Sequence, residues 1–457
     1  MSTSSVDISS LLSALGSSSS GINVAQAVSA AITADRAPEQ VWLQQQQTLQ
    51  TQTNTINQIV SSLSTLSNSL NSLSDPVGAL TSMGVTSSNT GLVTASASPG
   101  TLAGTHVVVV NNLATTASWY SDSEASSSTP LAAGSFTLQL GSGTPTTITI
   151  GSGVNTLDQL ASSINSQNLG VTASVVNDSS GARLAIVSNS SGSANDISIT
   201  NTSGLSFTRA NTGKNASLTV DGIPISSATN TVSGAVTGLT LNLVGASPGT
   251  EVNLSISPDA NQISSAVANF VNAYNTVIGE VNSQFAFDQT NQTAGPLAGD
   301  STVRMLQDDL LQGMSYSTTG SAVSTLADLG ITMNNDGTLS LDSSTLSNAI
   351  QNNFSAVQSF LQGTGSNGFA ESLNNQLNTL TDPAQGAFTV ELSSISNEQT
   401  DLTNEINNFE LYIANQQTVL TNEYTQADIA MQELSTQLSQ VQAELGLNQN
   451  NNNSSGG

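Results

Sequence analysis

The chain has 457 residues, with 31 Asp or Glu, only five Lys or Arg, one His and no Cys, so its formal net charge is −26. Because nucleic acids and anionic membranes are bound by clustered cations, this composition excludes both as partners. The lack of Cys also excludes disulfides and thiolate metal sites, and the length allows about two to four domains.

The first twenty residues lack the basic start and the long apolar core of a secretory signal peptide. No stretch reaches the roughly 18 consecutive apolar residues that a transmembrane helix needs. We therefore expect a protein without membrane insertion. If it leaves the cell, it uses a route that reads no conventional signal.

Residues 22–74 are predicted to be helical, because they contain no Gly and a single Pro. Pro38 is expected to break or kink this helix near its start, and Asp75, Pro76 and Gly78 to end it. From residue 42 onward, apolar residues form two interleaved series with heptad spacing, which indicates a coiled-coil seam. The seam residues are Trp42, Leu49, Ile56, Ile59, Leu63, Leu66, Leu70 and Leu73.

Residues 391–446 repeat this pattern near the other end of the chain, so we expect one long helix there. The heptad phase shifts where Gln416, Leu420 and Tyr424 follow one another at steps of four, a stutter that locally unwinds a left-handed supercoil. The seam residues of the last part are Leu420, Ala427, Leu434 and Val441 in one series and Tyr424, Met431, Leu438 and Leu445 in the other.

The two terminal segments differ in charge. The C-terminal segment contains nine acidic residues from Glu391 to Glu444 and no Lys or Arg, whereas the N-terminal segment has no charged residue from Gln40 to Ser74. Like charges repel, so an acidic helix packs more readily against a neutral helix than against its own copy. We expect the N- and C-terminal helices to pair with each other, and the seam to need further partners, among them other copies of the chain.

The middle of the chain, from about residue 84 to 258, is rich in Gly, Ser, Thr and Asn and contains short alternating segments typical of β-strands. One helix is predicted within this region, at residues 156–166. Between residues 259 and 390 helical patterns return at 262–285, 300–314 and 345–361, with Asp300 as an N-cap and a small hairpin around Asn334–Leu341.

These patterns predict an α+β multidomain fold in which long coiled-coil-like terminal helices form a stalk that carries a mixed helical middle domain and inserted β-rich head domains. Four units are expected. They are a terminal helical leg domain (1–75 and 391–457), a mixed, mostly helical domain (76–100 and 259–390), a β-rich head domain (101–120 and 213–258) and an inserted β-rich head domain (130–205).

Residues that could support catalysis are scarce. His106 is the only His and lies in a predicted strand, where capping or edging a sheet is expected rather than the role of a general base. Lys214 is the only Lys and lies in a turn without acidic or apolar neighbours. We therefore expect no enzymatic activity and no cofactor.

Two short motifs have simpler explanations than binding sites. Gly363–Gly368 contains the glycine spacing of the dinucleotide fingerprint, but a helical pattern rather than a strand precedes it. Asn334–Gly337 resembles the middle of a calcium loop, but Thr332 and Ser343 stand where acidic ligands are needed. A hairpin turn explains this segment better, and no metal site is expected.

Several stretches, in order along nearly the whole chain, resemble the motifs of one protein family. They are GINVAQAVSAAITADRAPE (21–39), NLATTAS (112–118), VNTLDQLASSIN (154–165), LTVDGIPISSATNTVSGAVTGLTLNL (218–243), LAGDSTVRML (297–306) and LADLGITMNNDGTLSLDSSTLSNAIQNN (326–353). Together they resemble the bacterial flagellar filament-capping proteins, also called hook-associated protein 2. The stretch at 154–165 is similar to the hook-flagellin insertion motif of that family.

The resemblance implies a structural assembly factor that caps the distal tip of the flagellar filament and promotes the insertion and folding of exported flagellin. It implies four kinds of partner: further copies of the chain in a ring of five or six, flagellin, hook–filament junction proteins and a cytosolic export chaperone. It also implies an extracellular location at the filament tip, reached by the flagellar type III export route without a cleaved signal peptide.

Two alternatives stay open from the sequence. One is a surface adhesin that uses the β domains for cell adhesion, and the other is a further axial protein of the hook–filament junction or flagellin type. In each case the terminal seams are the expected assembly surface. The predicted assembly-seam residues are Leu49, Ile56, Leu63, Leu70, Leu420, Tyr424, Met431, Leu434, Leu438, Val441 and Leu445.

Overall fold

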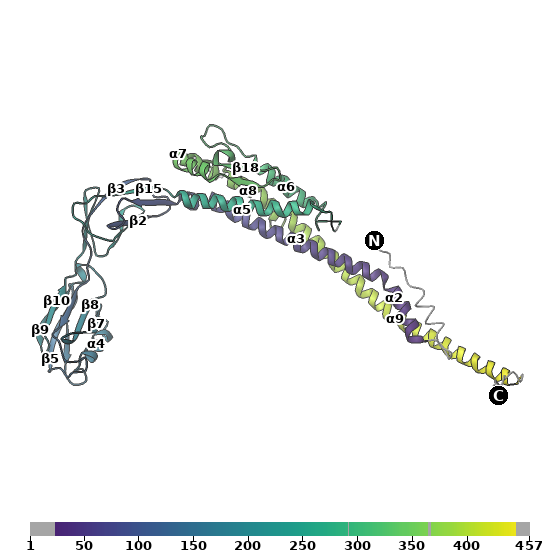
Figure 1. Ribbon diagram of the computed structural model, residues 1–457, viewed down its shortest axis with the longest axis horizontal. Helices are drawn as coiled ribbons and strands as arrows, with labels where there is room; N and C mark the ends of the chain where they lie inside the picture. The colour runs from purple at the N-terminus through teal and green to yellow at the C-terminus, as the bar shows by residue number, and fades with distance from the viewer. Residues whose placement is uncertain (1–22, 291, 364–366, 445–457) are drawn as a thin grey trace, which may run out of the picture.

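A computed structural model describes residues 23–290, 292–363 and 367–444 of the chain. It shows an elongated, bent molecule, with a long helical rod at one end and two β domains at the other (Figure 1). The described helices nearest the two ends of the chain lie side by side on the rod. In sequence, the β domains are inserted between these helices. The expected α+β multidomain fold with long terminal helices is confirmed.

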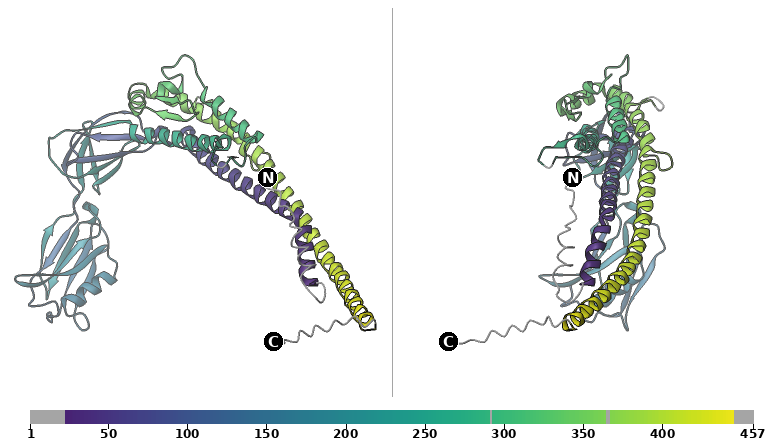
Figure 2. Two further views of the ribbon diagram at one scale, coloured as in Figure 1. Left: turned by 45° about the vertical axis from the view of Figure 1, so that its right-hand side comes forward. Right: turned by 90° about the vertical axis from the view of Figure 1, so that its right-hand side faces the viewer.

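Three helices form the end of the rod, and we call them the leg. They are α2 (Val24–Asp35), α3 (Ala37–Ser74) and α9 (Ala387–Glu444). The two helices α2 and α3 are separated at Arg36, and Pro38 lies in the first turn of α3, where its missing N–H is not needed. The predicted kink near Pro38 and the helix end before Asp75 are therefore confirmed. Figure 2 shows α9 running beside α3 in both views.

The seam of α3 is buried, as its heptad pattern predicts. Its partners are α5 (Ala260–Phe285), α8 (Phe369–Thr381) and the first part of α9. The predicted pairing of the terminal helices is confirmed, but most of the α3 seam faces the middle of the chain. One continuous apolar core thus joins the leg to the helical body.

The helical body surrounds α5. It contains α6 (Ser301–Met314), α7 (Ser343–Gln362), α8, the short helix η3 (Leu326–Leu329), the hairpin of β18 (Ile331–Met333) and β19 (Leu339–Leu341), and the smaller hairpin of β16 (Phe287–Asp288) and β17 (Thr293–Ala294). Asp259, Asp300 and Asp342 cap α5, α6 and α7 by accepting hydrogen bonds from backbone N–H groups. The N-cap predicted at Asp300 is confirmed.

The proximal β domain follows α3 through the short helix η1 (Ala79–Thr81) and holds two antiparallel sheets. The five-stranded sheet has the order β1 (Met83–Ser87), β15 (Val252–Pro258), β3 (Gly104–Asn112), β11 (Ala216–Val220) and β12 (Ile223–Ser227). The second has the order β13 (Thr231–Val236), β14 (Leu239–Leu243) and β2 (Val93–Ala97).

The placement of residues 83–97 differs from the expected domain division, which grouped them with the helical domain. β1 pairs with β15 along its whole length, and β2 pairs with β14. Val93 is fully buried in the core of the proximal β domain. The reason is that a short alternating strand can be completed only by a neighbouring strand, and those neighbours come more than a hundred residues later in the chain.

The distal β domain is inserted in sequence between β3 and β11 and is joined to the end of the proximal β domain (Figure 1). One sheet has the order β10 (Phe207–Asn211), β4 (Ser118–Ser121), β8 (Gly181–Ser188) and β7 (Val171–Asp178). The other has the order β6 (Thr146–Ile150), β5 (Gly134–Leu140) and β9 (Ile197–Ser203). Helix α4 (Leu157–Ser166), capped by Thr156, buries one apolar face against them, as predicted.

The shared core between leg and body gives a stability prediction. Leu66→Ala removes a fully buried side chain of α3 and should lower the free energy of unfolding of the helical part by about 2–5 kcal/mol. Val41→Ala removes an exposed apolar side chain of the same helix and should change it by less than about 0.5 kcal/mol. Urea unfolding followed by far-UV circular dichroism measures both. Equal effects of the two substitutions would contradict the packing described here.

Candidate functional site

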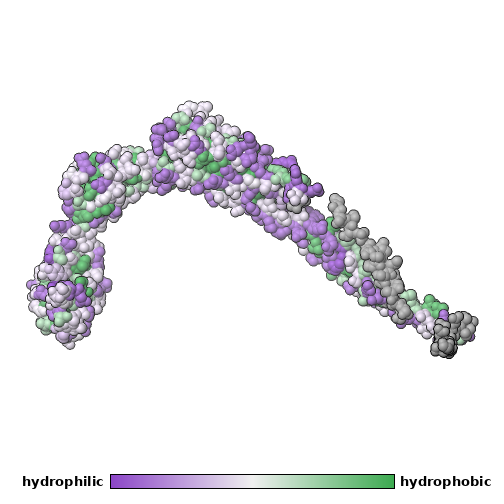
Figure 3. Space-filling view, viewed as in Figure 1, coloured by the Kyte–Doolittle hydropathy of each residue, from purple (hydrophilic) through white to green (hydrophobic). Residues whose placement is uncertain are grey.

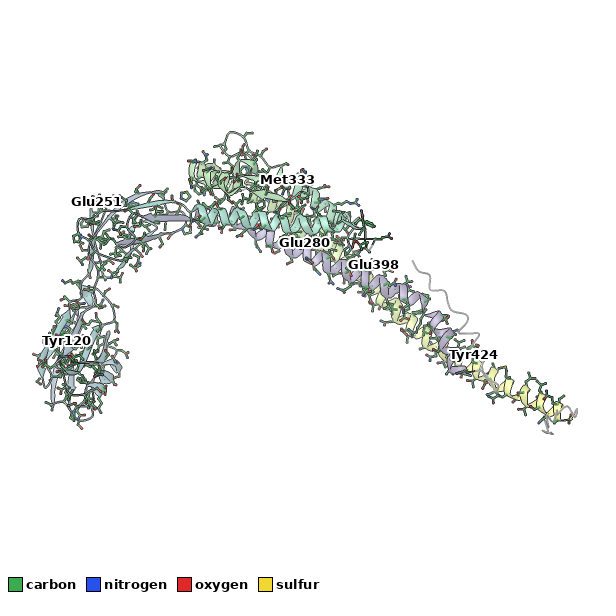
Figure 4. All side chains as sticks on the ribbon, in the orientation of Figure 1. Tyr120, Glu251, Glu280, Met333, Glu398 and Tyr424 are labelled. Carbon is green, nitrogen blue, oxygen red and sulfur yellow. The ribbon has the colours of Figure 1, made fainter. Side chains whose placement is uncertain are left out.

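The surface of interest is the part of α9 that extends past its partners in the described part of the chain. Its first half is covered: Ile395 and Leu402 are buried in the core that joins leg and body. Further along, Ile413 is buried under Val28 and Ile32 of α2. Leu420 and Tyr424 are half-buried at the end of this small cluster. Figure 4 shows Tyr424 on α9, near the place where α2 begins.

Beyond Tyr424 the seam continues without a partner among the described residues. Four of its side chains are exposed by 44–57%: Met431, Leu434, Leu438 and Val441. We call these four residues the distal seam. In Figure 3, hydrophobic residues are visible on the surface at this end of α9. Aliphatic side chains that keep strict heptad spacing while exposed are typical of a helix that pairs with another chain.

The predicted assembly residues thus fall into two groups. Leu49, Ile56, Leu63 and Leu70 of α3 are buried within one copy, so they hold the leg to the body and offer no surface to a second chain. The residues of α9 change from half-buried at Leu420 and Tyr424 to exposed in the distal seam. Leu445 lies outside the described residues.

Arg36 fixes the joint between α2 and α3 to α9. Its guanidinium donates two hydrogen bonds to Glu410, at 2.6 Å and 2.7 Å, and a third to Glu39 at 2.7 Å. Arg36 is the only cation of either terminal segment, so no other residue there could replace it. The bonded guanidinium holds the pKa of the Glu410 carboxyl below its usual range.

One aromatic contact and two side-chain hydrogen bonds extend this joint along the leg. Trp42 of α3 meets Phe409 of α9 edge to face, with ring centroids 5.1 Å apart. Gln45 and Gln46 donate hydrogen bonds to Glu398 and Thr403 of α9. The sequence analysis missed Arg36 as a contact residue, although its isolation in a neutral and acidic leg was a signal that could have found it.

A second joint brings two carboxyl groups together where α9 begins. Glu391 of α9 packs against Asp300, the N-cap of α6, with Thr302 beside them. Burial and the neighbouring Asp300 carboxyl raise the pKa of Glu391 to about 7. Below that pH the protonated Glu391 can donate a hydrogen bond to Asp300, and above it two negative charges face each other.

The residues considered for catalysis do not form an active site. The imidazole Nδ1 of His106, in strand β3, lies 2.7 Å from Asp221, which also accepts a hydrogen bond from the backbone N–H of Val107. Lys214 forms a backbone bridge with Thr115. The segment Asn334–Gly337 is the turn of the β18–β19 hairpin, as predicted.

Two further features of the described residues bear on function. None of their clusters of His, Cys, Asp or Glu could hold a metal ion. Among these same residues, no helix is both long and apolar enough to cross a membrane.

Part of Gly363–Gly368 lies outside the described residues. The part that is described follows helix α7, not a strand, which disagrees with a dinucleotide fingerprint.

Comparison with known proteins assigns the chain to a family. Residues 20–117 match the N-terminal family model of flagellar hook-associated protein 2, and residues 213–436 match its C-terminal model. The chain belongs to the flagellar hook-associated protein 2 family. Residues 135–190, in the distal β domain, match the flagellin hook IN motif.

Relatives and a solved structure agree with this membership. The chain is 30% identical to the B-type flagellar hook-associated protein 2 of Pseudomonas aeruginosa, over 70% of this chain and 75% of the relative. It is 25% identical to the A-type protein of the same species, over 79% and 82%. The crystal structure of the D1-D2-D3 domains of the Escherichia coli flagellar cap protein superposes with a TM-score of 0.58 at 27% identity, covering 75% of this chain and 99% of that one.

The Arg36 joint gives a prediction about local stability. Arg36→Gln removes the charged hydrogen bonds to Glu410 and should make amide hydrogen exchange in α2 about two- to fivefold faster, because α2 then opens from α9 more often. Hydrogen-exchange mass spectrometry of residues 24–35 measures this. Arg304→Gln, at an exposed position of α6, is the control and should leave that peptide unchanged. Unchanged exchange in Arg36→Gln would show that α2 is held by apolar contacts alone.

The carboxyl pair gives a pH prediction. The pKa of Glu391 is raised from 4.5 to about 7 on folding, so between these values the folded chain holds a proton that the unfolded chain has lost. The contribution of this protonated carboxyl to the free energy of unfolding is therefore complete below about pH 4.5 and falls as the pH rises to about 7. Glu391→Gln should remove this dependence, and its melting temperature should exceed that of the wild type at pH 8 more than at pH 5. Parallel pH profiles of wild type and variant would contradict the assignment.

Proposed function

We propose that this chain caps the growing flagellar filament and that the distal seam of α9 is its contact with incoming flagellin. A structural capping role in filament assembly follows from membership of the hook-associated protein 2 family. The observation that carries the finer proposal is the exposed distal seam at the end of the leg farthest from the β domains.

The chemistry of the distal seam suits a contact that forms and breaks repeatedly. Apolar side chains at heptad spacing can release one turn of a partner helix and pack against the next turn, because hydrophobic attraction is non-directional. A contact fixed by ion pairs would have to break them at each step. The seam has no cation to form such pairs, since α9 contains no Lys or Arg. These properties support a sliding contact with successive flagellin subunits.

The wider assembly follows the family resemblance. Copies of the chain associate with each other at the filament tip, and we propose a ring of five or six in which the β domains form a plate and the legs point into the filament. Hook–filament junction proteins precede the cap on the hook, and a cytosolic chaperone shields the C-terminal helix before type III export. The exposed seam supports a need for such shielding, because unpartnered apolar helices aggregate.

The matches favour the cap over the two alternatives. Both family models belong to hook-associated protein 2, and they match residues 20–117 and 213–436, which include most of both terminal segments. Nothing in the matches favours a surface adhesin or cell adhesion. Catalysis forms no part of the proposal, since the family is structural and the residues considered for it serve as turns and caps.

The capping role is tested by deleting the gene in its source organism. Cells that lack the cap should carry hooks without filaments and should release flagellin into the medium, seen by electron microscopy and by immunoblotting of the culture supernatant. A plasmid copy of the gene should restore filaments. Normal filaments with no released flagellin would remove the capping role.

The role of the distal seam is tested in the same strain with Leu434→Asp combined with Leu438→Asp. The two charges make the seam unable to pack, so filament formation should be lost while the β domains remain folded. Thr436→Asp with Gln440→Asp adds the same charge at the same spacing on the rest of the helix surface and should support filaments. Equal filament formation by both double variants would contradict a role for the seam.

A further inference from the structure

The distal seam is bordered by acidic residues at the positions that select a coiled-coil partner. With Tyr424, Met431 and Leu438 at a positions, Glu423 and Glu444 fall at g positions and Asp428 at an e position. Glu433 lies one residue before the seam residue Leu434. α9 itself contains no Lys or Arg. In coiled coils, e and g residues face the partner helix across the seam and decide which partners are accepted.

Two copies of α9 are poorly suited to pair along this surface. In a parallel pair, Glu423 of one copy would face Asp428 of the other, and the same repulsion would occur on the opposite side of the seam. In an antiparallel pair, g positions face g positions, so that acidic residues again meet only acidic or neutral ones. Like charges at these positions disfavour the self-paired state.

The covered part of α9 shows which partners its acids accept. Its partner α3 has no charged residue from Gln40 to Ser74. Glu398 of α9 accepts a hydrogen bond from the side-chain amide of Gln45 of α3. At the joint between α2 and α3 the partner is the cation Arg36, bound to Glu410 through its two terminal guanidinium nitrogens. Where α9 does meet an acid, at Asp300, burial and the neighbouring carboxyl raise the pKa of Glu391 to about 7. Away from the Glu391–Asp300 contact, a neutral amide and an arginine are thus groups that the acids of this helix bind.

We propose that the distal seam selects a partner helix whose apolar stripe is flanked by Lys or Arg, and that the acids beside it keep copies of α9 from pairing with each other. This inference rests on the proposed use of the seam as a docking surface, and it adds the chemistry of the partner. The partner is basic next to its stripe, the reverse of the charge on this chain. The acids therefore act as specificity residues, and the seam supplies the apolar contact.

The test uses the full-length chain and three synthetic helical peptides with identical apolar a and d residues. Their e and g positions are all Lys, all Gln or all Glu. Fluorescence anisotropy at low salt should show the Lys peptide binding on the order of tenfold more tightly than the Gln peptide, with the Glu peptide weakest. Raising the salt concentration should weaken the binding of the Lys peptide more than that of the other two peptides.

Two variants separate the charge effect from the apolar contact. In the triple variant Glu423→Gln, Asp428→Asn and Glu444→Gln, the three peptides should bind with similar affinity. Sedimentation should show more self-association by this variant than by the wild type, and adding Leu434→Asp with Leu438→Asp should abolish the difference. Leu434→Asp with Leu438→Asp should bind none of the peptides. The control Thr436→Asp with Gln440→Asp should keep the order of the wild type.

Equal binding of the Lys and Glu peptides by the wild type would overturn the proposal, as would self-association of the wild type that Leu434→Asp with Leu438→Asp abolishes. No flagellin is present in this experiment, so its outcome is independent of the filament assay. Selective binding of the Lys peptide, together with normal filaments from the seam variant in cells, would retain the basic partner and remove flagellin as that partner.

Discussion

The structure depends on a mismatch in length between α9 and the helices that cover it. α9 has 58 residues, but among the residues that the structure describes its cover ends near Tyr424, where α2 begins. About twenty residues, or roughly 30 Å of helix, continue beyond that point with the same heptad pattern. The pattern that buries Ile395, Leu402 and Ile413 inside the molecule therefore exposes the distal seam outside it. One sequence feature thus gives the leg its stability and its free surface.

Charge decides how the covered part of the leg is held. A helix with nine acids and no bases packs more readily against a neutral helix than against another acidic one, and α3 provides a neutral face of Gln, Asn, Ser and Thr. The single cation, Arg36, stands where the chain turns from α2 into α3, so one ion pair fixes the turn to Glu410. At the opposite end of the covered region, Glu391 meets Asp300, and their proximity is tolerated because Glu391 holds its proton to near neutral pH.

The sequence predicted the helices well, because heptads, caps and helix-stopping residues act over short distances. The kink near Pro38, the N-cap at Asp300 and the hairpin at Asn334–Leu341 were all local signals of this kind. It could not show that the α3 seam packs against α5 and α8 as well as α9, since a heptad specifies that a partner exists and not which one. The pairing of β1 and β2 with later strands was missed for the same reason: a strand of five residues carries no mark of its distant neighbour. The Glu391–Asp300 contact likewise joins segments 91 residues apart.

The central claim is that the distal seam touches flagellin during assembly, and cross-linking in secreting cells tests it most directly. The chain has no Cys, so a single Cys can carry a short photo-activated cross-linker at one chosen position. Leu438→Cys places it on the seam, and Gln440→Cys places it two residues away on the rest of the helix surface. The account predicts a cross-linked product with flagellin from position 438 and little from position 440. No flagellin product from 438, or equal yields from both positions, would contradict it.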